Sequence, residues 1–179
     1  MAADFNGLRT TKAALDALLE KLRVITWKGE KAFARVELFV ATDLVAALLK
    51  LFVTDPRTCL VVFGDKDFDS KVEGTQLNSK QARTVFVLVT DKRIGDDSGA
   101  LFGTEGNPGA IGLSDLVETE AMGLLLPNPK AIYAAPLHTE ILKVTDKDQK
   151  NLAGRWACVV TVEINGGLLV HNLGKGPIQ

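Results

Sequence analysis

The stretch Thr-Val-Phe-Val-Leu-Val-Thr, residues 84–90, contains neither Gly nor Pro and is rich in β-branched and aromatic side chains. This composition is typical of a β-strand that is buried on both faces. Residues 58–63, Thr-Cys-Leu-Val-Val-Phe, are also predominantly apolar and β-branched. Residues 155–164 are similar, but apolar and polar residues partly alternate in them. We therefore expect these three strands to form the middle of one sheet.

Helix-like and strand-like patterns surround these strands. Residues 33–39 and 138–145 alternate as strands. Residues 43–52 predict one helix, and a later helix is expected to begin at about Ala110 or at Ser114 and to end at Leu125, with Ser114-Asp115 able to cap its first turn. A first helix follows a loose lead-in, residues 1–9, with Thr10 or Thr11 as its cap. Its apolar positions follow helical spacing: Leu15, Leu18, Leu19 and Leu22.

This order of elements predicts an α+β fold with one mixed, mainly antiparallel β-sheet flanked by about three helices. Residues 1–167 are expected to form a single domain. Residues 168–179 contain apolar residues but no strong period, and we expect them to be a C-terminal arm.

Two long polar segments interrupt the pattern. Residues 64–80 are too polar for a core and are expected to be a loop. Residues 91–109 carry five glycines and one proline, which predicts a mobile excursion. Leu101 and Phe102 are its only neighbouring apolar pair, so they are a candidate contact with another chain. The alternative is that they fold back onto their own domain.

Composition excludes several classes of function. A net charge of −1 lacks the excess of positive charge that is typical of nucleic-acid-binding proteins. The longest apolar runs are too short for a membrane span, and the first residues do not resemble a signal peptide. Cys59 and Cys158 lie in predicted strands and are expected to be buried, and a disulfide would require neighbouring strands.

No motif predicts catalysis. Residues 65–69 alternate carboxylates like the start of a calcium loop, but Ser70 and Gln76 stand where that loop needs Gly and Glu. His138 and His171 are isolated, so neither a catalytic triad nor a metal cluster can be assembled. The glycines of residues 95–109 match no phosphate-binding pattern. We therefore expect no catalytic residue, no metal and no cofactor.

The layout of the whole chain is more informative than any single motif. An amphipathic helix at residues 15–22 precedes a short helix and the strand at residues 56–64. The strand at residues 83–90, a loop, a helix containing residues 116–125 and a final strand at residues 157–164 follow. This layout resembles the tail terminator or tail-completion proteins of long-tailed phages and prophages, including the Mu-like minor tail family. The short helix, residues 43–52, and the C-terminal arm depart from that pattern.

The resemblance implies a virion structural protein that forms a homo-oligomeric ring, expected to be a hexamer, without catalysis or cofactor. Such a ring caps the tail tube and meets the head connector or neck protein, so the expected location is the virion tail or neck, and the host cytoplasm during assembly. Apolar residues outside the core pattern are the expected subunit interface: Leu101, Phe102, Leu168, Leu169 and Val170.

Two other classes remain open. An adaptor or neighbouring neck or head-completion protein would bind a partner chain by adding a strand to an unpaired sheet edge, for which residues 33–39 are the candidate. A small enzyme would need His138 and the carboxylates of residues 65–69 in one cleft.

Overall fold

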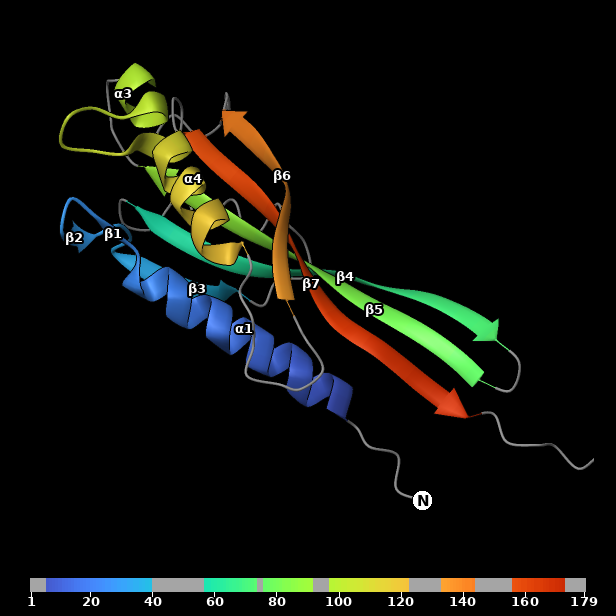
Figure 1. Ribbon diagram of the computed structural model, residues 1–179. Coiled ribbons are helices and arrows are strands. Elements are labelled where there is room, and N and C mark those ends of the chain that lie inside the picture. The colour runs from blue at the N-terminus through green and yellow to red at the C-terminus, as the bar shows by residue number, and fades with distance from the viewer. Residues whose placement is uncertain are drawn as a thin grey trace, which may run out of the picture.

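The computed structural model describes residues 6–39, 57–73, 76–91, 97–122, 133–143 and 156–172 of the chain. Five strands form one sheet in the order β3-β4-β5-β7-β6, in which only β3 and β4 are parallel. This arrangement confirms the predicted α+β class, with a mixed, mainly antiparallel sheet (Figure 1). The elements are α1 (Asn6–Val24), β1 (Thr26–Trp27), β2 (Glu30–Lys31), β3 (Arg35–Phe39), β4 (Thr58–Glu73), β5 (Gln76–Asp91), α3 (Asp97–Phe102), α4 (Gly109–Ala121), β6 (Tyr133–Lys143) and β7 (Trp156–Asn172).

The three strands expected in the middle of the sheet lie there. β5 is the central strand and pairs antiparallel with β4 on one side and with β7 on the other. Val85, Val87 and Val89 are fully buried on one face, and Leu88 is fully buried on the opposite face. Because both faces of this strand are buried, its sequence is a continuous apolar run and does not alternate with polar residues.

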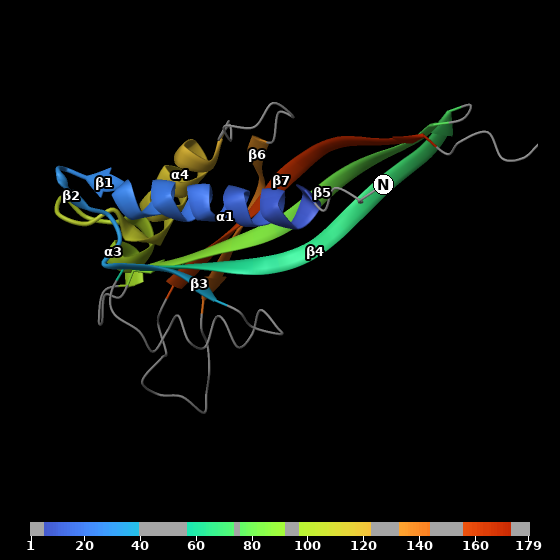
Figure 2. The ribbon, with the colours of Figure 1, turned by 90° about the horizontal axis from the view of Figure 1, so that it is seen from below.

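Helices α1 and α4 cover one face of the sheet, as Figures 1 and 2 show. The predicted apolar stripe of α1 is buried, with Leu18 and Leu22 fully inaccessible to solvent. Leu113 and Val117 of α4 complete this core above Cys158 and Val160. Helical spacing of apolar residues therefore correctly predicted the packed face of α1.

A second cluster lies on the opposite face of the sheet. Leu60, Val62, Leu88, Ala157 and Val159 are buried there. Their burial shows that the middle of the sheet has no free face to offer a partner.

Two of the three described helices, α1 and α4, begin earlier than expected. α1 begins at Asn6 and not after Thr10, so much of the expected lead-in is helical. α4 begins at Gly109, directly after Pro108, because the proline supplies a suitable φ and needs no N–H partner. Ser114 is therefore not a cap. It is buried inside the helix, where its hydroxyl donates a hydrogen bond to the Ile111 carbonyl oxygen at 2.7 Å.

The prediction of a loop at residues 64–80 is wrong. These residues complete β4 and begin β5, which pair as one long hairpin down to Glu73 and Gln76. A ladder of backbone hydrogen bonds does not need apolar side chains, so low hydrophobicity does not exclude a strand. The alternating carboxylates of residues 65–69 follow the two-residue period of this strand.

The prediction of a mobile excursion at residues 91–109 is also wrong for its described part, because these residues form α3 and a closed turn. Gly103 ends α3 with φ +84°, and its N–H donates to the Gly99 carbonyl oxygen at 3.0 Å. Thr104 and Asn107 exchange two backbone hydrogen bonds, and the Asn107 amide donates to the buried carboxylate of Asp91. Glycines allow this close packing. The sequence analysis took them as a sign of a loop, because glycines are common in loops.

The final strand is longer than the expected residues 155–164. β7 continues to Asn172, so residues 168–172 of the expected C-terminal arm pair with β5. Residues 173–179 and the helix expected at residues 43–52 lie outside the described residues. The division into a domain, residues 1–167, and an arm stays a prediction.

Candidate functional site

Three strands of the sheet continue past the rest of the fold. The last pair of β3 with β4 joins Phe39 to Val62, and β6 begins at Tyr133 opposite Asn165. Beyond these points β4, β5 and β7 run on together. We call residues 67–73, 76–82 and 165–172 the extension. Figures 1 and 2 show that its tip projects past the helices.

The base of the extension is shaped by a register shift between Phe63 and Lys66. A Cβ atom on Gly64 would lie 2.9 Å from both Phe86 Cε2 and the Thr84 carbonyl oxygen, so only glycine fits there without rearrangement. The Arg83 guanidinium lies 5.7 Å from the centroid of the Phe63 ring. A bulge of this kind bends a strand and increases its twist, and Figure 2 shows that the long strands curve beyond the end of α1.

Register distributes the residues of the extension unequally over its two faces. Positions 77, 79 and 81 of β5 continue the alternation of Val85 and Val87, so they share the face that α1 and α4 cover in the body. Arg83 continues the same alternation and pairs with Lys66, so this side of the sheet carries two charged residues at the base of the extension. The face comprises Phe68, Ser70, Val72, Leu77, Ser79, Gln81, Leu169 and His171.

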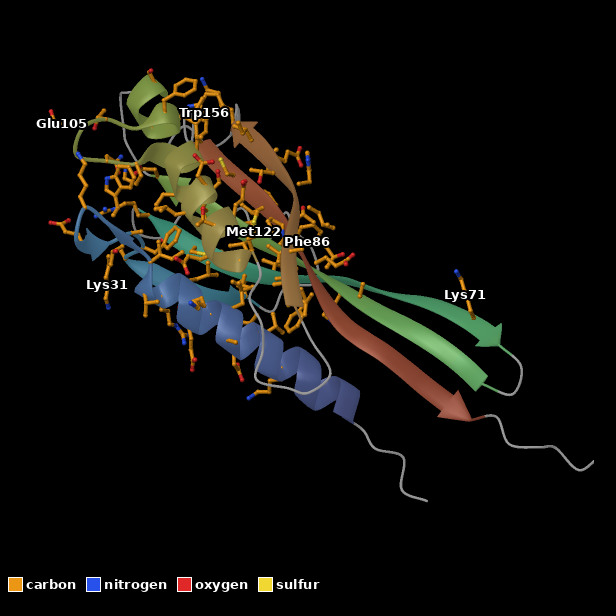
Figure 3. All side chains as sticks on the ribbon, viewed as in Figure 1. Lys31, Lys71, Phe86, Glu105, Met122 and Trp156 are labelled. Atoms are coloured by element: carbon orange, nitrogen blue, oxygen red, sulfur yellow. The ribbon has the colours of Figure 1, made fainter. Side chains whose placement is uncertain are left out.

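The opposite face contains every carboxylate and lysine of the extension. This face consists of the even-numbered positions of β5 and their partners in β4. Its charged residues are Asp67, Asp69, Lys71, Glu73 and Lys80. Lys71 is exposed, and Figure 3 shows its side chain projecting from β4 near the tip.

The strand edges of the sheet differ in what they expose. Among the described residues, no strand pairs with the outer sides of β3 and β6, of β4 beyond Val62, or of β7 beyond Asn165. β6 has two large apolar side chains in contact with solvent, Leu137 at 59% and Ile141 at 48% exposure. Unpaired edges of this kind are the usual sites of strand addition and of contact between chains.

The five residues predicted at a subunit interface lie in two separate places. Phe102, at the end of α3, is 69% exposed, and Leu101 is half-buried. Leu168, Leu169 and Val170 belong to the extension, where they pair with Lys80, Ser79 and Asn78. Figure 1 shows α3 and the extension at opposite ends of the molecule. The structure does not bring the two predicted contacts together within one chain.

The residues of the enzyme alternative do not meet either. His138 lies exposed on β6, while residues 65–69 lie on β4, with β7 and β5 between these strands. Three strand spacings amount to about 14 Å, which is too far for acid–base cooperation. Within the described ranges there is also no group of three His, Cys, Asp or Glu residues able to hold a metal ion.

The two cysteines are buried and unpaired. β5 separates their strands, because Cys59 pairs with Val89, which in turn pairs with Cys158. Burial raises the pKa of the Cys59 thiol. Burial also raises the pKa of Cys158; a hydrogen bond with Ser114 lowers it, and the nearby charges of Asp115 and Glu118 raise it. These environments suit inert core thiols, not nucleophiles.

In the part of the chain that the structure describes, no helix combines the length and the apolar character needed to cross a bilayer. A scan against protein-family models finds no match, and a search of curated proteins also finds none.

Solved structures with some likeness to this chain are found. A chain of the solved structure titled "Virion of native gene transfer agent (GTA) particle" matches with a TM-score of 0.46 and 13% sequence identity. The match covers 87% of this chain and 96% of that chain. A likeness of this size assigns no function to this protein.

Proposed function

We propose that this chain is a structural protein of a phage or phage-like virion, where it closes the end of the tail tube as a ring and meets the head connector or neck protein. The observation that carries the proposal is the extension, a three-stranded sheet that leaves the body without helical cover. The resemblance of the chain's layout to tail terminators supports the particular position at the end of the tail.

The arrangement of exposed regions supports head-to-tail association of copies. Phe102 and the extension lie at opposite ends of the chain, so a contact that involves both joins different surfaces of two copies. Contacts between different surfaces generate a closed ring when the rotation between copies closes. The proposed ring is a hexamer, and its partners are the tail tube protein and the neck protein. The chain carries out no reaction in this role.

Electron microscopy with purified tail tubes tests this function directly. The proposal predicts that the protein binds at the ends of tubes as a ring and not along their sides. A matched pair of variants, Phe102→Glu and Glu105→Gln, asks whether the α3 end takes part, since both residues are exposed on the same short segment. Unoccupied tube ends at saturating protein would contradict the assignment.

A second candidate is an adaptor that binds a partner chain by strand addition. The favouring observation is the position of β3 at the edge of the sheet, where Leu38 is 37% exposed. An adaptor of this kind would form a one-to-one complex with its partner through β3. Leu38→Lys would then abolish binding to the partner protein and leave the number of copies in any ring unchanged.

A further inference from the structure

Helix α3 has little packing of its own to hold it in place. It has six residues, which is too short for a helix to be stable alone. Among its described side chains, Ala100 is fully buried, whereas Leu101 is only half-buried and Phe102 is 69% exposed. Burying one methyl group and part of a leucine contributes little hydrophobic stabilisation. The position of α3 therefore depends on the turn that follows it.

That turn is fastened to two other parts of the fold. The Lys28 ammonium, between β1 and β2, donates a hydrogen bond to the Glu105 carbonyl oxygen. Figure 3 shows Glu105 on the turn at the outer end of the molecule. The Asn107 amide donates to the carboxylate of Asp91, the last residue of β5. Two side-chain contacts from separate elements thus hold residues 97–107, which we call the flap.

The flap lies against Trp156, the first residue of β7. α3 contacts β7, and Figure 3 shows Trp156 beside α3. The indole nitrogen Nε1 of Trp156 is buried and has no hydrogen-bond partner within the described part of the chain. Lys143 of β6 lies over the ring, with its Nζ 5.0 Å from the ring centroid. A buried donor without a partner costs free energy that contact with water would recover.

We propose that the flap opens as one unit and exposes Trp156 to solvent, and that the contacts of Lys28 and Asn107 keep it closed. Segments that bury little apolar surface open locally at a much lower free energy than the whole fold. When the flap is closed this end of the chain presents Phe102, and when it is open the chain presents Trp156. The inference concerns a single copy and does not depend on the proposed ring.

Fluorescence quenching of Trp156 tests the opening. Trp27→Phe leaves Trp156 as the single tryptophan and serves as the parent for every comparison. Lys28→Met keeps the apolar stem of the side chain and removes the donor. Lys31→Met is its control, because Lys31 is also exposed on the β1–β2 hairpin. Acrylamide is expected to quench Trp156 more strongly in Lys28→Met than in the parent, and equally in the control and the parent.

A second variant tests the other fastening. Asn107→Asp replaces the amide donor by a carboxylate, which is repelled by Asp91, and is also expected to increase quenching of Trp156. Glu105→Gln is its control, since Lys28 contacts the backbone carbonyl of Glu105 and not its side chain. Circular dichroism verifies that each variant is folded at the temperature of the measurement. Quenching equal to that of the parent in either folded test variant would overturn the proposal.

Hydrogen exchange asks whether the flap opens as one unit. The N–H groups of Gly103, Thr104 and Asn107 all donate hydrogen bonds within it. Because one hydrogen bond is lost from the closed state, Lys28→Met is expected to raise all three exchange rates by the same factor, roughly 2–10-fold. Exchange at residues 85–89 should not change. A rise confined to Thr104, next to the lost contact, would indicate local fraying and overturn the proposal.

Discussion

At the residue scale, Gly103 and Gly109 hold the turn between α3 and α4, and both have positive φ angles. Gly109 has φ +70°, and a Cβ atom there would lie 2.3 Å from the backbone nitrogen of Gly103. Gly106 lies in the same turn, has no atom within 4 Å of such a Cβ, and does not require a left-handed backbone. Comparing substitutions at Gly109 and Gly106 therefore distinguishes the effect of close packing from the effect of a change in an exposed part of the turn.

Gly109→Ala is expected to lower the free energy of unfolding by about 2–3 kcal/mol, because it adds backbone strain to a steric clash. For a chain of this size the melting temperature should fall by roughly 4–10 °C. Gly106→Ala is expected to change it little. Thermal unfolding followed by circular dichroism measures both, and equal melting temperatures would contradict the described turn.

The cysteines lead to a second residue-scale prediction. Because burial raises the pKa of both thiols, native protein at pH 8 is expected to label very slowly with a thiol reagent, whereas denatured protein labels at two sites. Because the pKa of each thiol is higher in the folded than in the unfolded protein, stability should decline as pH rises above about 8.5, where the unfolded thiols ionise. Rapid labelling of Cys59 in folded protein would contradict its complete burial.

At the element scale, sequence patterns predicted the packed elements better than the polar ones. Periodicity identified the buried face of α1 and the three central strands, because apolar burial dominates the energetics of those segments. The same reasoning missed the extension, since its strands are held by a backbone ladder and its sequence is polar. It also missed α3, a six-residue helix whose stability depends on contacts from the following turn.

The candidate site was predicted only in part. Leu168, Leu169 and Val170 were identified as apolar residues outside the core pattern, and they lie in the extension, although their role stays a prediction. The edge strand β6 was expected at about the right place, but the sequence did not reveal its exposed Leu137. Exposure at a sheet edge depends on strand order, and strand order follows from pairings that are distant in sequence.

The extension should also differ from the body in its dynamics. It lacks a helical layer, and three strands without a buried face are only marginally stable. Amide hydrogens of residues 76–82 are therefore expected to exchange much faster than those of residues 85–89 in the monomeric protein. In assembled wild-type protein the exchange at residues 76–82 should slow. Equal protection of both parts of β5 in the monomer would show that the extension is stable without a partner.

At the scale of the whole molecule, one long sheet combines two features. Its covered middle provides a folded body, and its uncovered end provides a surface that needs another chain. A net charge of −1 imposes little electrostatic repulsion between copies. This combination suits an assembly protein, because folding and association use different parts of the same strands.

We propose that copies of this chain join head to tail into a ring. The most direct measurement is the mass of the purified protein across a range of concentrations by light scattering, with negative-stain imaging of any large species. The account predicts a ring of about six copies of the 19.2 kDa chain. A protein that stays monomeric at every concentration, and remains so when tail tubes are added, would contradict it.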